Sequence, residues 1–239
     1  MAKKSSYPIS LLSLKARLKS DRLLSLLVKF VRFAPWFFRG ISTIYEHAAF
    51  NQWLKATSPH RRHSVYQHFS SRNDLWCFMA AYLKVKPYTH IFEFGVANGD
   101  GARFWLDALE NIEYHGFDCF TGMPEQYRHI PARVFDLGGN PPPIRDSRAH
   151  WHVGLVQTTL KEFAFPNAES RLFLFDLDLY GPTLFALSVL LPNMRSGDLI
   201  YFDEAFDNAE GVVARHFFET TTEAQIFGSA TGCMAVVIP

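Results

Sequence analysis

The stretch that decides the fold is IFEFGVANGDG, which runs from Ile91 to Gly101. Its first residues are apolar and aromatic, as in a buried strand, and its last residues open a helical pattern. The glycines at 95, 99 and 101 let the backbone turn sharply and approach a ligand, and the start of the helix offers free N–H groups. Dinucleotide-binding folds need G-x-G-x-x-G, but Ala97 and Asp100 stand where that register needs glycine. The stretch therefore predicts a ligand-binding turn that differs from the dehydrogenase fingerprint.

The pattern of strand, turn and helix repeats from this stretch to the end of the chain. We expect buried strands over 90–96, 114–118, 152–156, 172–175, 199–202, 225–227 and 234–238, and helices over 102–109, 183–191 and 211–220. Strands that alternate with helices imply a mostly parallel sheet covered on both faces, and two last strands joined by a short turn must pair antiparallel. The sequence thus predicts a doubly wound α/β fold with a seven-stranded sheet and one antiparallel C-terminal strand, preceded by N-terminal helices.

The composition of the 239 residues narrows the class of protein. With 48% hydrophobic and 20% charged residues the chain can bury a substantial core, which excludes wholesale disorder. The three cysteines, Cys77, Cys119 and Cys233, are too few and too scattered for a disulfide framework or a zinc cluster. Such cysteine usage indicates a reducing compartment, and we expect the cytoplasm.

Charge is distributed unevenly along the chain, although the formal net charge is only +1. Residues 1–40 hold nine basic and one acidic side chain, whereas the other 199 residues hold 15 basic and 22 acidic ones. Between residues 11 and 33 polar positions recur every three or four residues. This spacing predicts a helix with one basic face and an otherwise apolar surface. We therefore divide the chain into a basic helical arm over 1–40, a helical cap over 41–88 and a ligand-binding domain over 89–239.

The basic arm has three candidate partners. Docking on the body or on a second subunit, as in a homo-oligomer, is favoured over contact with an anionic membrane, and nucleic acid is the least favoured. Uncharged runs of 18 residues are lacking, so the arm is not expected to span a bilayer. Charges interrupt its apolar stretch and no small-residue cleavage site follows, which argues against a secretory signal. We expect a cytoplasmic protein, with peripheral membrane association as the alternative role of the arm.

Acidic residues follow directly on two of the expected strands. FLFDLDLYGPT ends one strand at Asp176 and Asp178, and LIYFDEAFD ends the next at Asp203 and Glu204. Ligands bind at the carboxyl edge of open α/β sheets, and adjacent strands would bring these four carboxylates to one place there. Buried carboxylates repel one another unless a divalent cation, a basic partner or raised pKa values relieve them. Oxygen ligands favour a hard ion such as Mg²⁺ over Mn²⁺ or Ca²⁺.

The glycine-rich stretch resembles motif I of the class I methyltransferases that use S-adenosylmethionine. Glu93, Gly95 and Gly99 match the pattern of that family and Asn98 lies within the turn, which implies that these residues cradle the methionine part of the cofactor. Asp118 in YHGFDCF stands where the family has an acid that holds the ribose hydroxyls. The resemblance implies a Rossmann-like sheet that ends with one reversed strand.

The acidic segments resemble the macrocin O-methyltransferase family, which methylates sugar hydroxyls on antibiotics. The resemblance spans roughly residues 90–220 and also includes GFDCFTGMPE and GLVQTTL. It implies that Asp176, Asp203 and Glu204 hold Mg²⁺ and that Asp178 is the general base, so Asp176 and Asp178 are the candidate catalytic residues. The family usually has a second Asp in place of Glu204, and a Tyr where this chain has Ala205.

These features predict an S-adenosylmethionine-dependent, Mg²⁺-assisted O-methyltransferase that acts on a hydroxyl of a small molecule or sugar. Tyr180 and the aromatic and histidine side chains of residues 41–70 are candidates for the acceptor pocket, with ordinary packing an equally favoured role for Tyr180. The lysine of catechol-type methyltransferases is replaced by Leu179, which disfavours their mechanism. Two alternatives stay open, namely a metal-independent methyltransferase acting on another small molecule or a lipid-linked glycan, and a cofactor-binding module without activity.

Overall fold

The computed structural model describes residue 29 and residues 35–57, 60–128 and 130–239. The helix predicted over residues 11–33 lies outside these residues, apart from residue 29. The chain divides into two compact units, residues 1–45 and 46–239, and the second unit carries the sheet. Helix α3 (Pro35–Thr57) belongs to both ranges. None of the helices in the described residues combines the length and the apolar character that crossing a membrane needs.

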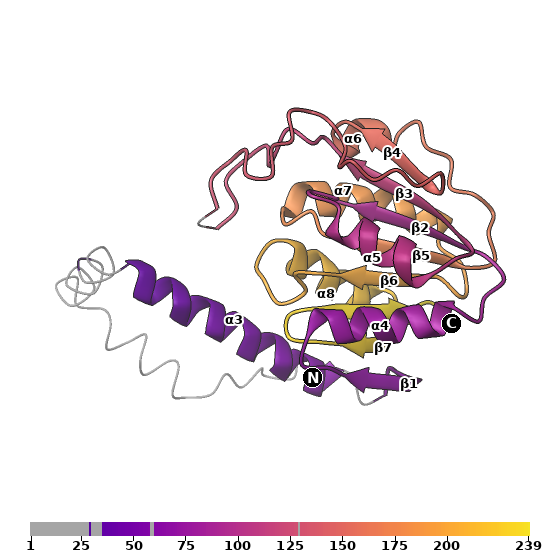
Figure 1. The fold of residues 1–239 in the computed structure, drawn as a ribbon. Coiled ribbons are helices and arrows are strands. Elements are labelled where there is room, and N and C mark those ends of the chain that lie inside the picture. The colour runs from indigo at the N-terminus through magenta and orange to yellow at the C-terminus, as the bar shows by residue number, and fades with distance from the viewer. Residues whose placement is uncertain (1–28, 30–34, 58–59, 129) are drawn as a thin grey trace. The chain divides into compact units, whose positions relative to one another are not determined.

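A single eight-stranded sheet organises the second unit. Its strands are β1 (Arg62–His68), β2 (Thr89–Phe94), β3 (Ile112–Asp118), β4 (Ala149–Val153), β5 (Arg171–Phe175), β6 (Leu199–Phe202), β7 (Gln225–Ser229) and β8 (Met234–Val237). They lie in the order β1-β7-β8-β6-β5-β2-β3-β4 (Figure 1). Only β8 runs against its neighbours, β6 and β7. The predicted doubly wound sheet with one reversed C-terminal strand is therefore confirmed.

Helices cover both faces of this sheet (Figure 1). Helices α4 (Arg72–Leu83) and α5 (Asp100–Ala108) pack on one face, where Trp105 and Tyr114 are fully buried. The other face carries α6 (Val156–Thr159), α7 (Tyr180–Leu190), the short 3₁₀ helix η1 (Leu191–Asn193) and α8 (Glu210–Thr220). The sheet is thus buried on both sides, which leaves its edges and strand ends as places for a ligand.

The face under α6, α7 and α8 is built largely from phenylalanine. Side chains alternate between the two faces of a strand, so every second residue of β2, β3, β5 and β6 reaches this core. Rings on adjacent strands lie with centroids 5.0–5.3 Å apart, in stacked or tilted pairs. The six fully buried rings belong to Phe92, Phe94, Phe117, Phe173, Phe175 and Phe202. Aromatic pairs of this kind add to the free energy of burial, which accounts for the abundance of phenylalanine in the sequence.

The segment predicted as a helical cap over 41–88 contains a strand, and this corrects the prediction. Strand β1 pairs parallel with β7 and adds an eighth strand to the seven that were expected. Tyr66 and His68 each bond to the hydroxyl of Ser229 at 2.9 Å, and Arg61 donates to Ala224 O. Because β1 is an edge strand with most of its side chains exposed, it lacks the apolar alternation that identifies buried strands.

The strand predicted over 152–156 is displaced toward the N-terminus. Strand β4 ends at Val153, and Val156 already begins α6. Gly154 between them has a φ of 147°, a backbone conformation that ends regular pairing and that few other residues adopt.

A buried ion pair joins β5 to the turn before β6. Arg171 Nε lies 2.8 Å from Asp198 Oδ1 and Arg171 Nη2 lies 2.6 Å from Asp198 Oδ2, with both residues almost inaccessible. Asp198 also accepts a bond of 2.8 Å from the backbone N–H of Arg195. Charge-assisted bonds with two parallel contacts are geometrically specific, so the pair fixes how β5 and β6 start relative to each other.

Candidate active site

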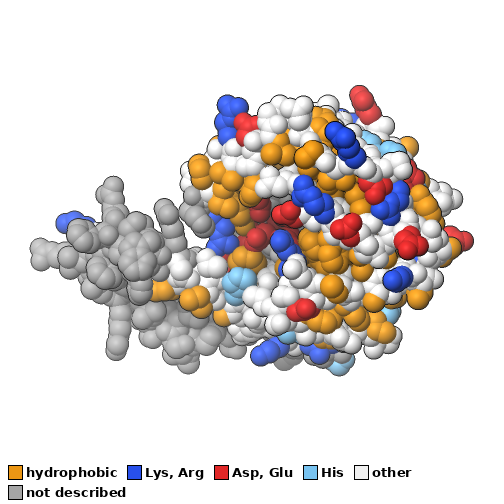
Figure 2. Space-filling model, viewed as in Figure 1, with side chains coloured by type: hydrophobic (Ala, Val, Ile, Leu, Met, Phe, Trp, Pro, Cys, Tyr) orange, Lys and Arg blue, Asp and Glu red, His pale blue; other side chains and the backbone are white. Residues whose placement is uncertain are grey.

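A cavity of about 680 Å³ opens at the carboxyl ends of β2, β3, β5 and β6. The glycine turn after β2, the loop after β3, the segment 154–157 and the acidic ends of β5 and β6 line it, together with Arg72 and Trp76 of α4. Figure 2 shows acidic side chains in a hollow of the surface, next to hydrophobic and basic side chains. The volume and the mixed lining are typical of sites for small molecules and cofactors.

The glycine turn is tightly constrained by its neighbours. Gly95 has a φ of 90°, and a Cβ there would overlap the backbone carbonyl of Asp176. Gly99 has a φ of 80° and caps the start of α5, and a Cβ there would lie 2.7 Å from Pro142 Cγ. The structure thus gives physical reasons for glycine at both positions, and it leaves the first N–H groups of α5 beside the cavity.

Glu93 lies under this turn rather than in open solvent. It is 4% exposed, accepts a hydrogen bond from the hydroxyl of Tyr114, and leaves no room for a side chain at Gly101. Burial raises the pKa of Glu93 to about 8, and the bond from Tyr114 only partly offsets this. Glu93 contributes to the cavity wall beside the glycine turn.

Asp118 holds the glycine turn from the neighbouring strand. Its Oδ2 accepts bonds of 2.9 and 2.8 Å from the backbone N–H groups of Val96 and Ala97, and its Oδ1 accepts one of 2.8 Å from Phe120. A carboxylate has about four acceptor sites, so about one stays available for another donor. The predicted bond to ribose hydroxyls would use this remaining site. Asn98 is exposed at the tip of the turn and also lines the cavity.

The four predicted acids of β5 and β6 reach the same cavity. The two strands are parallel neighbours, as expected, and Asp176, Asp178, Asp203 and Glu204 all line the cavity. Burial is the main cause of raised pKa values in three of these acids, and the negative charge of Asp203 is the second cause. The pKa of Asp176 lies well above its usual value, the pKa of Asp178 is about 6, and the pKa of Glu204 is about 8. The predicted crowding of negative charge is therefore present at this edge of the sheet.

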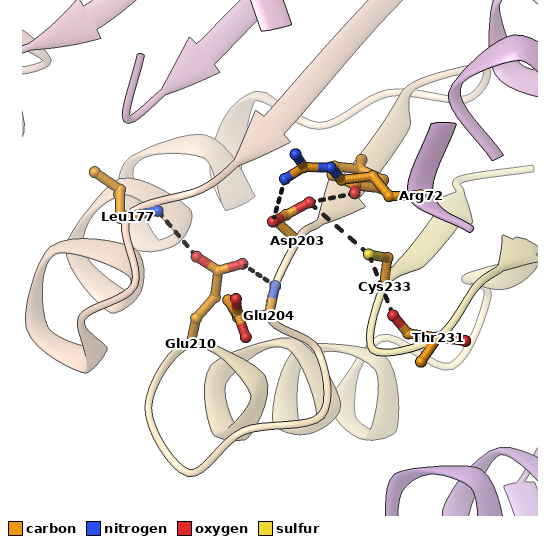
Figure 3. Close-up of polar contacts among 8 residues, drawn as sticks. Arg72, Leu177, Asp203, Glu204, Glu210, Thr231 and Cys233 are labelled. Carbon is orange, nitrogen blue, oxygen red and sulfur yellow. Dashed lines mark hydrogen bonds and ion pairs between the residues drawn. The ribbon is translucent and has the colours of Figure 1, made fainter. Parts of the chain in front are cut away.

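Asp203 has partners that the sequence analysis did not anticipate. Arg72 Nη1 lies 2.9 Å from Asp203 Oδ2, and the hydroxyl of Tyr201 donates to Oδ1 (Figure 3). Cys233 Sγ lies 3.8 Å from the same Oδ1. Arg72 opens α4, and its guanidinium lies 5.0 Å from the ring of Trp76. Arg72 thus neutralises part of the negative charge. A basic partner is one of the three ways, named in the sequence analysis, in which repulsion between the carboxylates can be relieved.

Glu210 was also missed by the sequence analysis. This side chain is fully buried and accepts bonds of 3.0 Å from Leu177 N and 3.2 Å from Glu204 N (Figure 3). Burial raises its pKa well above the usual value. Because Glu210 holds one backbone N–H from each acidic loop, it fixes the distance between the ends of β5 and β6.

Asp178 has an unusual backbone conformation. Its φ of 59° lies in the left-handed region, which costs a residue with a side chain about 1 kcal/mol or more. Leu179 follows as the N-cap of α7. Strained residues of this kind occur often at active sites, where the surrounding structure over-determines their conformation.

The three predicted metal ligands do not form a compact set. Among the described residues, the group of three whose ligand atoms lie within 4.8 Å of one another is His90, Glu113 and His115, and not Asp176, Asp203 and Glu204. The acidic set nevertheless fits a hard divalent cation in its chemistry, because every donor is a carboxylate oxygen and the negative charge is in excess.

The predicted acceptor pocket needs a correction. Among the described residues, the cavity lining begins at Arg72 and includes neither Tyr180 nor any residue of 41–70. Strand β1 lies at the far edge of the sheet, separated from β6 by β7 and β8, and Tyr180 is 50% exposed. The aromatic and apolar lining comes instead from the loop after β3, through Met123, Tyr127, Ile130 and Phe135.

Comparison with known proteins gives similarity in structure alone. No protein-family model matches the chain, and no curated protein matches it. A crystal structure of CalS11, a calicheamicin methyltransferase, is similar over 81% of this chain and 91% of that chain, with 19% identity and a TM-score of 0.54. An apo structure of CalS11, described as a TDP-rhamnose 3'-O-methyltransferase, covers 81% and 93%, with 20% identity and a TM-score of 0.50.

These similarities agree with the strand order and the reversed β8 described above. They extend over most of both chains, so the resemblance is not confined to one motif. The chain has the fold of the class I S-adenosylmethionine-dependent methyltransferases.

Proposed function

We propose that the protein is an S-adenosylmethionine-dependent O-methyltransferase that acts on a hydroxyl of a small molecule or sugar. The observation that carries this proposal is the shared cavity, in which the glycine turn and the acidic ends of β5 and β6 line one space. A cofactor bound at the turn would thus lie beside groups that can remove a proton from an acceptor. The sugar O-methyltransferase activity named for CalS11 supports this choice of acceptor class.

The turn residues have distinct roles in the proposal. The backbone at Gly95 and Gly99 gives the cofactor close access, and Asn98 contacts it from the tip of the turn. Asp118 holds the turn through the N–H groups of Val96 and Ala97, and Glu93 packs against Gly101 at the start of α5. The remaining acceptor site of Asp118 receives a ribose hydroxyl.

Asp178 is the proposed general base. Its pKa of about 6, raised by burial and then by Asp203 and Asp207, leaves it ionised at neutral pH and strong enough to accept a proton. Asp203 and Arg72 shape the acidic wall opposite, and Glu210 keeps the two acidic loops at a constant spacing.

Asp176, Asp203 and Glu204 are the proposed ligands of a divalent cation of the Mg²⁺ class. Such an ion, when bound, would supply a Lewis acid that lowers the pKa of an acceptor hydroxyl. The oxygen donors of all three residues and the raised pKa values of Asp176 and Glu204 support the assignment, because a cation would stabilise the ionised carboxylates.

A metal-independent methyltransferase is the second candidate, and one contact favours it. Arg72 already neutralises part of the charge on Asp203, and the three acids lack the spacing of a preformed site. In this version the guanidinium replaces the ion in balancing the acidic wall.

The decisive experiment is calorimetry of the full chain with S-adenosylmethionine and S-adenosylhomocysteine, followed by methyl-transfer assays. We expect both compounds to bind at one site, and we expect a sugar nucleotide with vicinal hydroxyls to gain one methyl group by mass spectrometry. Absence of binding to a folded protein would refute the proposal. The same assay after treatment with EDTA separates the candidates, since only the metal-dependent enzyme loses activity and regains it with Mg²⁺.

A further inference from the structure

A group of histidines lies on the sheet away from the cavity. His90 is on β2, Glu113 and His115 are on β3, and His150 and His152 are on β4. Strand pairing sets His90 opposite Glu113, and His115 opposite His150. All five side chains therefore lie on one face of the sheet, and none of them lines the cavity at the carboxyl ends.

The spacing of three of these side chains fits a metal ion. His115 Nε2 lies 3.3 Å from Glu113 Oε1, and His90 Nδ1 lies 3.7 Å from Glu113 Oε2. Their ligand atoms all lie within 4.8 Å of one another. Tetrahedral zinc with bonds of about 2.0–2.2 Å holds its ligand atoms about 3.3–3.6 Å apart, so the observed pairs need little adjustment.

Among the described residues, the ring nitrogens that face Glu113 have no hydrogen-bond partner. His90 Nδ1 and His115 Nε2 are buried and unsatisfied, and His115 as a residue is 8% exposed. Buried polar atoms of this kind are costly and need an explanation, which an ion at this place would provide.

His115 is also oriented as metal-binding histidines are. Its Nδ1 lies 3.2 Å from His152 Nε2, and the ring stacks on Phe92 at 5.2 Å. When Nδ1–H donates to His152, Nε2 carries the lone pair that a metal needs.

We propose that His90, Glu113 and His115 bind a divalent transition-metal ion, with zinc as the preferred ion. Two imidazoles and one carboxylate form a borderline-soft donor set that suits zinc and disfavours Mg²⁺. His150 Nε2 lies 3.5 Å from Glu113 Oε1 at the more exposed edge of the group. This side chain or a water molecule completes the coordination.

The site is separate from the acidic cavity in position and in ion preference. Its ligands come from the first half of β2 and from β3, whereas the cavity lies at the opposite ends of these strands. An ion here would join β2 to β3 near the edge of the sheet and would stabilise the folded state, because the site is assembled only on folding.

The test is zinc binding to the full chain, prepared without a histidine tag and stripped of metal. Isothermal titration with ZnCl₂ should give one equivalent for the parent protein. His115→Phe keeps the ring stacking and Glu113→Gln keeps the shape, yet each should weaken zinc binding by at least about 100-fold. The matched controls are His216→Ala and Cys77→Ser. Each removes an exposed side chain of a type that can bind zinc but that lies outside the proposed site, so the affinity for zinc should stay unchanged.

Two further measurements make the test independent of catalysis. Circular dichroism and thermal denaturation in EDTA should show that both variants fold, while added zinc should raise the melting temperature of the parent protein only. X-ray absorption spectroscopy at the zinc edge of the zinc-loaded protein should identify imidazole and carboxylate ligands. The proposal is overturned if the parent protein binds no zinc, if both variants bind it as tightly, or if only Asp203→Asn abolishes binding.

Discussion

Arg72 Nη1 lies 2.9 Å from Asp203 Oδ2, so the guanidinium of α4 is directed at an acid that ends β6. Asp203 is 8% exposed, whereas the Arg72 side chain keeps nearly half of its surface in solvent. The same carboxylate is a proposed metal ligand. A divalent ion bound there would therefore compete with the guanidinium for one negative charge.

This competition predicts the effect of Arg72→Met. If a cation binds at Asp203, removing the guanidinium should lower the Mg²⁺ concentration for half-maximal methyl transfer by roughly threefold to tenfold, about 1 kcal/mol for a partly exposed charge pair. Arg72→Lys, which keeps the charge, is the control. Loss of activity that no Mg²⁺ concentration restores would instead favour the metal-independent enzyme.

The contact between Gly101 and Glu93 predicts that Gly101→Ala is destabilising. The added Cβ would overlap the buried carboxylate, and overpacking of this kind costs about 1–3 kcal/mol in the free energy of unfolding. Gly181→Ala in the first turn of α7 is a control, because a Cβ there has nothing within 4 Å among the described residues. Urea denaturation should show a clear loss of stability for Gly101→Ala and a smaller change for Gly181→Ala, and equal losses would contradict the packing argument.

Glu93 also predicts a pH dependence of stability. Because its pKa rises from 4.5 to about 8 on folding, its stabilising contribution is complete below 4.5 and is lost as the pH rises to about 8. Glu93→Gln should therefore reduce the decline in the free energy of unfolding over this range, by at most about 1.4 kcal/mol per pH unit. Denaturant titrations at several pH values measure the difference between the two proteins. Parallel curves would show that Glu93 titrates normally.

Two substitutions of Asp178 distinguish the effect of losing the carboxylate from the effect of relieving the backbone strain. Asp178→Asn and Asp178→Gly both remove the carboxylate and should reduce kcat by about 10²–10⁴. Glycine adopts a φ of 59° without the steric cost, so it should be the more stable of the two. In the parent protein kcat/KM should rise with pH through about 6 as the base ionises. A flat profile, or full activity of either variant, would exclude Asp178 as the base.

The sequence was sufficient to predict the core of the fold. Strand β6 falls on the predicted residues because four apolar residues stand between a Gly-Asp turn and an acidic pair. Strand β1 was missed because an edge strand that exposes most of its side chains has no apolar period. Its hydrogen bonds to β7, more than 150 residues away, leave no local signal.

The site was predictable only where its residues follow a strand. Asp176 and Asp203 were found because both stand at the carboxyl ends of apolar runs. Arg72 and Glu210 were missed because each reaches the acids from a helix, and no local spacing indicates that approach. The sequence analysis did not single out His150 and His152, because their proximity to His115 depends on cross-strand register, which the sequence does not specify.

The buried pair of Arg171 and Asp198 has a consequence at the opposite edge of the sheet. Asp176 follows Arg171 by five residues, and Asp203 follows Asp198 by the same number. Two parallel segments of equal length, tied together at their start, must finish level, about 17 Å away at 3.3 Å per residue. The ion pair thus helps to set Asp176 and Asp203 level with each other at the carboxyl ends of the two strands, in the register that β5 and β6 keep along their whole length.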